Sequence, residues 1–408
     1  MEKIVVKNLY KIFGSRSKLA RDLLEKGVSK KDIQEKTGAV VGVQNANFSI
    51  QNGEIFVIMG LSGSGKSTLQ RLLNRLWEPT SGSILIDGKD ITKLDKNSLR
   101  KVRREHFCGM VFQQFAILPH RTVLENVAFG LEIQGVAKEE RFERAQKMID
   151  VVGLSGNEQS YPTQLSGGMQ QRVGLARALT VDADILLMDE AFSALDPLIR
   201  RDMQNELLEL QQKMQKTIVF VTHDLDEALR LGDRIAIMKD GEIVQLGTAE
   251  EIIAKPANDY VKAFIQDIDR SEVYTAGSIM QEPREIAHSN DGPRTILRKM
   301  QRKGLSSIFM IDTERALVGR IDADPLAAYL KENSGDVAGK VPAELVEKTL
   351  PLSKETPLQE VMVKIQQVPG PLPVLDEKKH LVGVIVRGAI IAALSSHPET
   401  DETKGEDQ

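Results

Sequence analysis

The residues with the most recognisable chemistry form a glycine-rich segment between an apolar run and a helical pattern. This segment, Gly60-Leu61-Ser62-Gly63-Ser64-Gly65-Lys66-Ser67-Thr68, matches the phosphate-binding pattern G-x-x-x-x-G-K-[ST] in the strand-then-helix context that the pattern requires. Glycines let backbone N–H groups turn towards phosphates, and the start of the helix adds partial positive charge. We therefore expect a nucleoside triphosphate here, with Lys66 on its β and γ oxygens and Ser67 on Mg²⁺.

A second candidate is a pair of carboxylates at the end of an apolar run. The sequence Ile185-Leu186-Leu187-Met188-Asp189-Glu190 indicates a buried strand, and a buried strand cannot hold charged side chains without partners. We expect both carboxylates at the C-terminal edge of a parallel sheet, where such sheets bind ligands. Asp189 would act on Mg²⁺, and Glu190 would polarise the attacking water.

A third segment begins a predicted helix with a serine and two glycines, in Leu165-Ser166-Gly167-Gly168-Met169-Gln170-Gln171. The serine can cap the helix, and the N–H groups at a helix start can bind an anion. Since the chain already has one phosphate loop, a second anion-binding start is surplus within a single subunit. It predicts contact with a nucleotide held by another copy.

Strand-like and helix-like patterns alternate around these motifs. Apolar runs at 54–59, 185–189, 217–222 and 234–239 are separated by longer amphipathic segments, which favours an α/β core with parallel strands. Further strands are expected at 3–8 and 45–50. The run from about 125 to 180 has a mainly helical pattern and is expected to form a separate lobe.

The remainder of the chain contains an internal repeat. Asp312 and Asp376 are 64 residues apart, as are Gly319 and Gly383, and each copy indicates helix, strand, tight turn, strand and helix. We expect a nucleotide-binding domain at 1–268 and a repeat domain at 269–397, with copies at about 272–333 and 341–397. The acidic tail at 398–408 lacks apolar periodicity, so we expect it to be disordered.

Composition excludes several classes of protein. The 408 residues carry 54 Lys and Arg against 58 Asp and Glu, and this net charge of -4 argues against nucleic-acid binding. The single cysteine, Cys108, cannot form an internal disulfide. No run of about 18 apolar residues and no signal-peptide pattern is present, so we expect a cytoplasmic chain whose membrane spans, if any, belong to another subunit.

Taken together, the motifs resemble those of the ATP-binding cassette (ABC) ATPases. The phosphate loop, the LSGGMQQ segment, the ILLMDE strand, Ser193-Ala194-Leu195-Asp196 and His223 follow that family's order and spacing over about residues 1–245. The resemblance implies an α/β fold class, a P-loop ABC ATPase cassette with a helical lobe. It also implies hydrolysis of ATP with Mg²⁺ in a head-to-tail homodimer, where catalysis is mostly positioning and charge neutralisation.

The same resemblance assigns further roles. Gln113 would bind Mg²⁺ and sense the γ-phosphate, with Gln114 as the alternative, and His223 would contact the γ-phosphate beside catalytic Glu190 and Lys66. An aromatic residue would stack on adenine, either Phe13 or, as the competing candidate, Tyr10. The implied ATP contacts within one copy are Phe13, Gly60, Ser62, Gly63, Ser64, Gly65, Lys66, Ser67, Thr68, Gln113 and Asp189, and those from the other copy are Ser166, Gly167, Gly168, Gln170 and Asp196.

The repeat narrows the class of ATPase. The paired copies resemble α+β tandem CBS domains, and a cassette followed by that tandem is similar to the ATPase subunits of osmoregulatory glycine betaine importers. This implies an integral membrane permease partner with a substrate-binding domain, a peripheral position on the cytoplasmic face of the membrane, and transport of glycine betaine, carnitine or choline. The rival interpretation is a nucleotide-regulated ABC ATPase that moves a non-transport partner.

A ligand of the repeat is less clearly indicated. CBS domains that bind AMP or ATP usually carry a hydroxyl and, three residues later, an acid after their second strand. Both positions differ in Gly319-Arg320-Ile321-Asp322-Ala323-Asp324-Pro325 and in Gly383-Val384-Ile385-Val386-Arg387-Gly388-Ala389. The resemblance to relatives in which the tandem binds cyclic di-AMP implies a possible site at Val384, Ile385 and Arg387.

A basic segment interrupts the cassette between Phe13 and Val43. Residues 15–38 carry seven Lys or Arg and four Asp or Glu, and Ser17 and Ser29 could cap two short helices within an insertion at 15–41. One interpretation is a solvated spacer. The other is that its net +3 approaches an anionic membrane surface and is screened by salt, through Arg16, Lys18, Arg21, Lys30 and Lys31.

Overall fold

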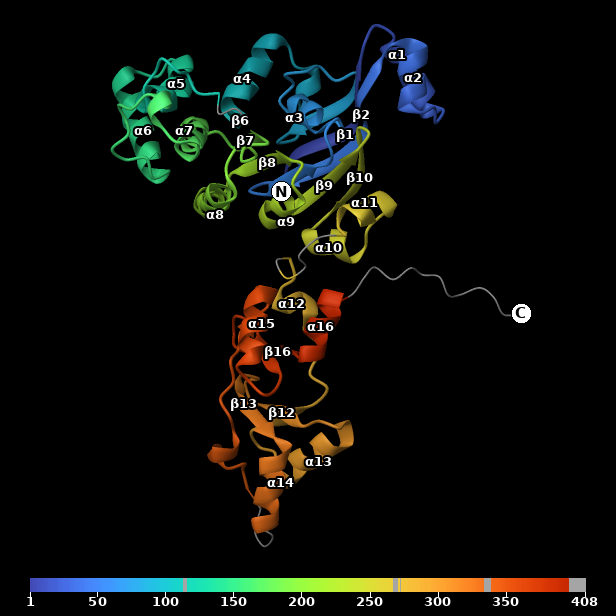
Figure 1. The fold of residues 1–408 in the computed structure, drawn as a ribbon, viewed down its shortest axis with the longest axis vertical. Coiled ribbons are helices and arrows are strands. Elements are labelled where there is room, and N and C mark those ends of the chain that lie inside the picture. Colours follow the sequence, from blue (N-terminus) through green and yellow to red (C-terminus); the bar gives the residue numbers. More distant parts are fainter. Residues whose placement is uncertain (113–115, 267–270, 272, 334–338, 396–408) are drawn as a thin grey trace, which may run out of the picture. The chain divides into compact units, whose positions relative to one another are not determined.

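In the computed structural model, a six-stranded sheet in the order β10-β9-β3-β8-β7-β6 runs through the first unit of the chain (Figure 1). All neighbours pair in parallel except β9 and β10. Because parallel strands end at the same edge, the segments after β3, β7 and β8 are brought together there. The strands are β3 (Ile55–Met59), β6 (Phe107–Phe112), β7 (Ile185–Asp189), β8 (Thr217–Thr222), β9 (Arg234–Lys239) and β10 (Glu242–Gly247).

The structure describes residues 1–112, 116–266, 271, 273–333 and 339–395. It separates into two compact units, Met1–Gln266 and Asp267–Gln408, which are treated individually below. The predicted fold class, an α/β P-loop cassette followed by an α+β repeat, is confirmed.

A second, antiparallel sheet shares a hydrophobic core with the first. It has the order β2-β1-β4-β5, and Phe48 of its β2 stacks on Phe56 of β3 with ring centroids 5.2 Å apart. Its first two strands are longer than the sequence predicts because they form one hairpin, paired from Glu2 with Gln51 to Phe13 with Val40. The strands are β1 (Glu2–Phe13), β2 (Val40–Gln51), β4 (Ser81–Ile86) and β5 (Lys89–Asp90).

Helices complete the first unit. The predicted helical lobe is present as three helices that enclose their own core, which includes Val127, Ile149 and Val173. Figure 1 shows this lobe beside β6 and β7. The lobe helices are α5 (Val123–Ile133), α6 (Lys138–Val151) and α7 (Gly167–Thr180), and the others are α3 (Lys66–Leu73), α4 (Lys96–His106), α8 (Pro197–Met214), α9 (Leu225–Leu231), α10 (Ala249–Ala254) and α11 (Asp259–Phe264).

The basic insertion folds as two short helices, α1 (Ser17–Glu25) and α2 (Lys30–Thr37), between β1 and β2. They bury Ala20 and Ile33 in a small cluster that extends onto the strands at Ile12 and Val41. Ser29 caps α2 as predicted, accepting a hydrogen bond from the N–H of Asp32. The predicted cap at Ser17 is wrong, because the helix includes Ser17 and its capping residue is Arg16, which makes no side-chain cap bond.

The second unit contains two copies of one small fold. Each copy has a three-stranded sheet, β11-β12-β13 or β14-β15-β16. The tight turns match at the predicted offset, with left-handed Arg315 and Lys379 and with Asp312 and Asp376 each accepting N–H bonds within the turn. The elements are α12 (Ala276–Ile279), β11 (Ile286–His288), α13 (Pro293–Lys303), β12 (Ser307–Ile311), β13 (Leu317–Asp322), α14 (Ala323–Glu332), β14 (Leu352–Ser353), α15 (Leu358–Gln366), β15 (Leu372–Leu375), β16 (Leu381–Ile385) and α16 (Arg387–Ser395).

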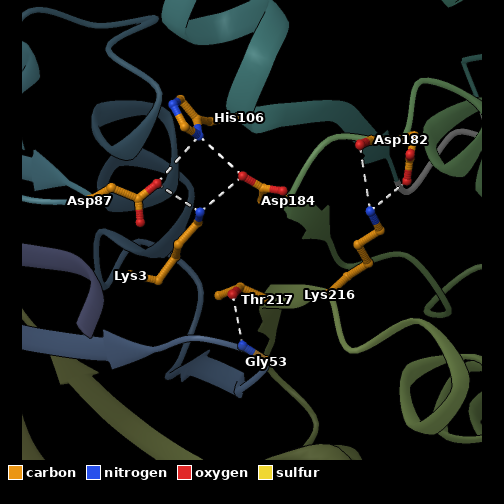
Figure 2. A network of polar contacts seen from close by, with 8 residues as sticks. All are labelled: Lys3, Gly53, Asp87, His106, Asp182, Asp184, Lys216 and Thr217. Carbon is orange, nitrogen blue, oxygen red and sulfur yellow. Dashed lines mark hydrogen bonds and ion pairs between the residues drawn. The ribbon is translucent and has the colours of Figure 1, made fainter. Parts of the chain in front are cut away.

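A polar network ties the first strand to the edge of the parallel sheet away from the phosphate loop (Figure 2). Lys3 Nζ lies 2.8 Å from a carboxylate oxygen of Asp87 and 2.9 Å from one of Asp184, and His106 Nδ1 lies 3.2 Å from Asp184. The Lys3 ammonium thus lies within ion-pair distance of both carboxylates. This network joins β1 to the segments that precede β6 and β7.

Among the described residues, no helix has the length and apolar character needed to cross a membrane.

Candidate ATP site

The phosphate loop connects β3 to α3 and depends on glycine at two positions. Gly60 and Gly65 have φ values of +148° and +104°, which L side chains rarely adopt. A Cβ at Gly60 would overlap the carbonyl oxygen of Met238, and one at Gly65 would overlap that of Gly42. Glycine is therefore required at these two positions of the loop both by the backbone conformation and by the close approach of neighbouring backbone atoms.

Lys66 lies at the start of α3 with its ammonium folded onto the loop. Its Nζ donates hydrogen bonds to the carbonyl oxygens of Gly60 at 2.7 Å and Leu61 at 3.1 Å. Burial lowers the pKa of Lys66, and the nearby Glu190 and Asp189 carboxylates act in the opposite direction. A phosphate group would replace the two carbonyls with a charged partner for this ammonium.

Two hydroxyl groups of the loop, those of Ser64 and Ser67, are further candidates to contact a phosphate or a cation. The buried Ser64 hydroxyl has no hydrogen-bond partner among the described residues. Ser67 Oγ donates to Asp189 Oδ1 at 3.1 Å, which brings an alcohol and a carboxylate from different elements together. Oxygen donors of this kind suit Mg²⁺, and the exposed Ser62 and Gly63 leave the loop open to a ligand. Thr68 lies one residue further along α3, half-buried.

The edge of β7 supplies both predicted carboxylates. Burial raises the pKa of Asp189, whereas the Ser67 bond and the charge of Arg71 lower it. Glu190 has left-handed backbone, with φ +48°, and its N–H donates to the carbonyl of Val221 at 2.9 Å. Glu190 therefore lies in a turn immediately after the last residue of β7.

His223 follows β8 and meets Glu190, with Nδ1 3.2 Å from Oε2. The segment after β8 is also held by a buried carboxylate, that of Glu227, which the sequence patterns did not predict. Glu227 accepts hydrogen bonds from Thr222 and Gln204, and burial raises its pKa. The structure therefore brings Lys66, Ser67, Asp189, Glu190 and His223 to one edge of the sheet.

Gln70 is another functional neighbour that sequence analysis missed. Its side chain is completely buried on α3 and donates to the carbonyl of Met188 at 2.9 Å, which fixes the phosphate helix against β7. The signal in the sequence is a polar residue on the apolar face of an amphipathic helix, and that pattern has no unique interpretation. Gln113 and Gln114 lie outside the described residues.

The LSGG segment begins α7, in the helical lobe, whereas the phosphate loop begins α3 beside the sheets (Figure 1). Ser166 caps α7 by accepting from the N–H of Met169 at 3.3 Å, and both Ser166 and Gly167 are exposed. Gly168 is half-buried against Ile199, and Gln170 donates to the carbonyls of Pro162 and Leu165. Asp196 is exposed and caps α8 through the N–H of Ile199.

The two candidate adenine-stacking rings differ in their surroundings. Phe13 and the methyl group of Thr68 both border Gly42, so Phe13 lies next to the phosphate helix. Its ring packs edge-on against Trp77, with centroids 5.1 Å apart. A cation lies over each ring, with Lys11 Nζ 4.9 Å from the Phe13 centroid and the Arg21 guanidinium of the insertion 5.3 Å from that of Tyr10, so proximity to the phosphate helix is what separates the two candidates. This arrangement favours Phe13.

The second unit has a cavity of about 250 Å³ lined by both of its copies, with Arg284, Ser306 and Phe309 from the first and Val384 and Val386 from the second. Of the predicted ligand residues, Val384 lines this cavity. The side chain of Ile385 is completely buried in the core of the second copy and is not among the residues that line the cavity. Arg387 donates to the carbonyls of Ile365 and Val368.

Comparisons with known proteins agree with this geometry. Residues 43–193 match the family model described as ABC transporter, and residues 344–396 match the CBS domain model. The chain is 53% identical over 397 residues to the glycine betaine/carnitine transport ATP-binding protein GbuA of Listeria monocytogenes, covering 97% of this chain and 98% of that protein. It is 50% identical over 395 residues to the glycine betaine/proline betaine transport system ATP-binding protein ProV of Escherichia coli, covering 96% and 97% respectively.

A solved structure supports the cassette fold. The dimeric structure of MJ0796, a bacterial ABC transporter cassette, is 35% identical with a TM-score of 0.51, covering 60% of this chain and 98% of that one. On these grounds the chain belongs to the ABC transporter family, as an ATP-hydrolysing transport ATPase subunit with a C-terminal CBS domain.

Proposed function

We propose that this chain hydrolyses ATP to drive import of glycine betaine or a related quaternary amine through a membrane permease subunit. The observation that carries the proposal is similarity over nearly the full length, CBS region included, to ATP-binding proteins named for glycine betaine transport. Carnitine is a second candidate, because GbuA is named for both compounds. We place the chain at the cytoplasmic face of the membrane, bound to its permease.

In the proposed reaction, Lys66 and the loop N–H groups hold the terminal phosphates, and Ser67 and Asp189, with Gln113, would hold Mg²⁺. When bound, Mg²⁺ would neutralise charge on the phosphate oxygens. Glu190 orients and polarises the attacking water, and His223, 3.2 Å from its carboxylate, positions that carboxylate and contacts the γ-phosphate. Phe13 would stack on the adenine ring.

The site is completed by a second copy. Ser166 and Gly167 at the start of α7 are exposed, and the phosphate loop of the same chain begins a different helix, α3. We infer that Ser166, Gly167 and Gly168 contact the γ-phosphate bound by the other copy, with Gln170 shaping that turn and Asp196 nearby. ATP then holds two copies together, and its hydrolysis lets them separate.

Transport itself is tested by reconstituting the chain with the permease subunit of a glycine betaine importer in vesicles that contain ATP. Uptake of labelled glycine betaine that competes with unlabelled carnitine would support the proposal. ATPase activity that the permease leaves unchanged, together with no uptake, would favour the rival non-transport function.

We also propose that the insertion senses ionic strength at an anionic membrane surface. Arg16, Lys18 and Lys31 are exposed. Arg21 and Lys30 are engaged within the protein, by an ion pair with Glu25 and a hydrogen bond to the Val41 carbonyl, so they are poorer candidates. An attraction of about 1 kcal/mol per nearby cation would be screened as salt rises. Replacing the three exposed cations with glutamine should flatten the salt dependence of uptake in anionic vesicles, and an unchanged curve would refute this role.

A regulatory ligand of the second unit is proposed as cyclic di-AMP. The support is a cavity bordered by Val384 and a cation, Arg284, that can meet a phosphate. Calorimetry on the full chain should detect binding that Arg284→Gln weakens and Arg387→Gln leaves nearly unchanged, because Arg387 is bonded to backbone. Absence of heat at high protein concentration would contradict the proposal.

A further inference from the structure

One lysine of the insertion contacts backbone that borders the phosphate loop. Lys30, the first residue of α2, is half-buried, and its Nζ donates to the carbonyl oxygen of Val41 at 3.1 Å. The same ammonium lies against the β9–β10 turn, since a Cβ placed on Gly241 would be only 2.5 Å from it. Lys30 therefore joins α2 to β2 and to this turn.

Three glycines bring those two segments into backbone contact with the phosphate loop. A Cβ on Gly65 would overlap the Gly42 carbonyl and lie 3.3 Å from the Gly241 Cα, and a Cβ on Gly241 would lie 2.8 Å from the Gly42 oxygen. Gly42, Gly65 and Gly241 thus form a cluster in which three chain segments touch without intervening side chains. Any displacement of one segment is transmitted directly to the others.

Hydrogen bonds fix this glycine cluster. The N–H of Gly241 donates to the carbonyl of Ser64, within the phosphate loop, at 2.8 Å, and the N–H of Gln44 donates to the carbonyl of Gly241 at 2.9 Å. The turn is thereby bonded on one side to the loop and on the other to β2. Lys30 sits on the outer side of the same junction, next to Val41 and Gly241.

We propose that Lys30 is a positioning residue for ATP binding, which holds β2 and the β9–β10 turn against Ser64 and Gly65 of the phosphate loop. The insertion then has a second role besides any contact with a membrane, because the contacts of α2 with β2 and the β9–β10 turn hold the phosphate loop in place. Burial lowers the pKa of Lys30, and the charges of Asp240 and Glu242 oppose this, as is typical of an enclosed ammonium.

The adjacent lysine provides a matched control. Lys31 is exposed and carries the same charge on the same helix. Lys30→Met and Lys31→Met in the full chain therefore remove identical charge, while only the first removes the bond to Val41. We would measure the KM and kcat of ATP hydrolysis, and amide hydrogen exchange in peptides covering residues 60–66 and 238–244.

For Lys30→Met we expect KM for ATP to rise about three- to tenfold, the range for loss of one hydrogen bond, with kcat at saturating ATP within about twofold. Amide hydrogen exchange should accelerate in both peptides, because the hydrogen bond from the Gly241 N–H to the Ser64 carbonyl, which joins them, is less well held. Because these assays contain no membrane, where we propose that Lys31 acts, Lys31→Met should match the parent chain. If Lys30→Met does not fold, Lys30→Gln, whose side chain is too short to reach Val41, takes its place. Equal KM and exchange in the two lysine variants, or a fall in kcat alone, would overturn the proposal.

Discussion

Glu190 is the residue on which turnover should depend most. Its carboxylate is held beside His223, and its backbone is fixed by the bond from its N–H to Val221. Glu190→Gln keeps the shape of the side chain but removes the carboxylate that we propose polarises the attacking water, so we expect kcat to fall by about 10²- to 10⁴-fold while ATP binding persists. Steady-state hydrolysis and binding of a fluorescent ATP analogue would check this. Glu209→Gln, exposed on α8, is the control, and near-normal hydrolysis by Glu190→Gln would remove Glu190 from its role.

At the scale of elements, the Lys3 network should hold β1 to the edge of the parallel sheet (Figure 2). Lys3→Met removes a buried ammonium from between Asp87 and Asp184, whose carboxylates are partly exposed and partly screened. We expect a loss of about 1 to 3 kcal/mol in the stability of the first unit. Calorimetry would measure this loss, and the unfolding transition of the first unit would be recognised as the one that ATP shifts. The control is Lys89→Met, which should have little effect because Lys89 is exposed on β5.

The Lys3 network also predicts how the stability of the first unit changes with pH. Burial on its own raises the pKa of Asp184, but the hydrogen bond and charge of Lys3, with His106, outweigh it and lower the pKa below its usual value. A lowered folded-state pKa contributes stability above the unfolded value, about 4, and loses it as pH falls through the folded value. The stability difference between the parent chain and Lys3→Met should therefore shrink below about pH 4. A difference that is constant through the acid range would contradict this account.

At the scale of the whole molecule, ATP should join two copies through the start of α7. Ser166→Asp keeps a helix-capping side chain but places a negative charge where a phosphate of the other copy would bind, and Ser166→Asn caps without charge. In the Glu190→Gln background, we expect ATP-dependent dimers with Ser166→Asn and their loss, by at least about tenfold in affinity, with Ser166→Asp. Light scattering would measure this, and equal dimerisation of both variants would exclude Ser166 from the interface.

The features that could be predicted from the sequence are local ones. The phosphate loop can be recognised in the sequence because Gly60 and Gly65 adopt backbone conformations that residues other than glycine rarely adopt. The cap at Ser29 and the repeated turns at Asp312 and Asp376 are readable for the same reason, since each involves residues only two to four apart. Parallel strands then predict that Asp189 and His223 meet at one edge.

Which residues from distant segments share an environment could not be predicted from the sequence and came from the three-dimensional fold. It placed Phe13 beside the phosphate helix and Tyr10 beside Arg21 of the insertion, although both rings lie on one strand. It also distinguished Lys30 from Lys31, which are adjacent and chemically identical, by packing one against Val41 and Gly241 and exposing the other. Packing between segments far apart in the chain leaves no periodic signal, because its energy depends on three-dimensional neighbours rather than on local spacing.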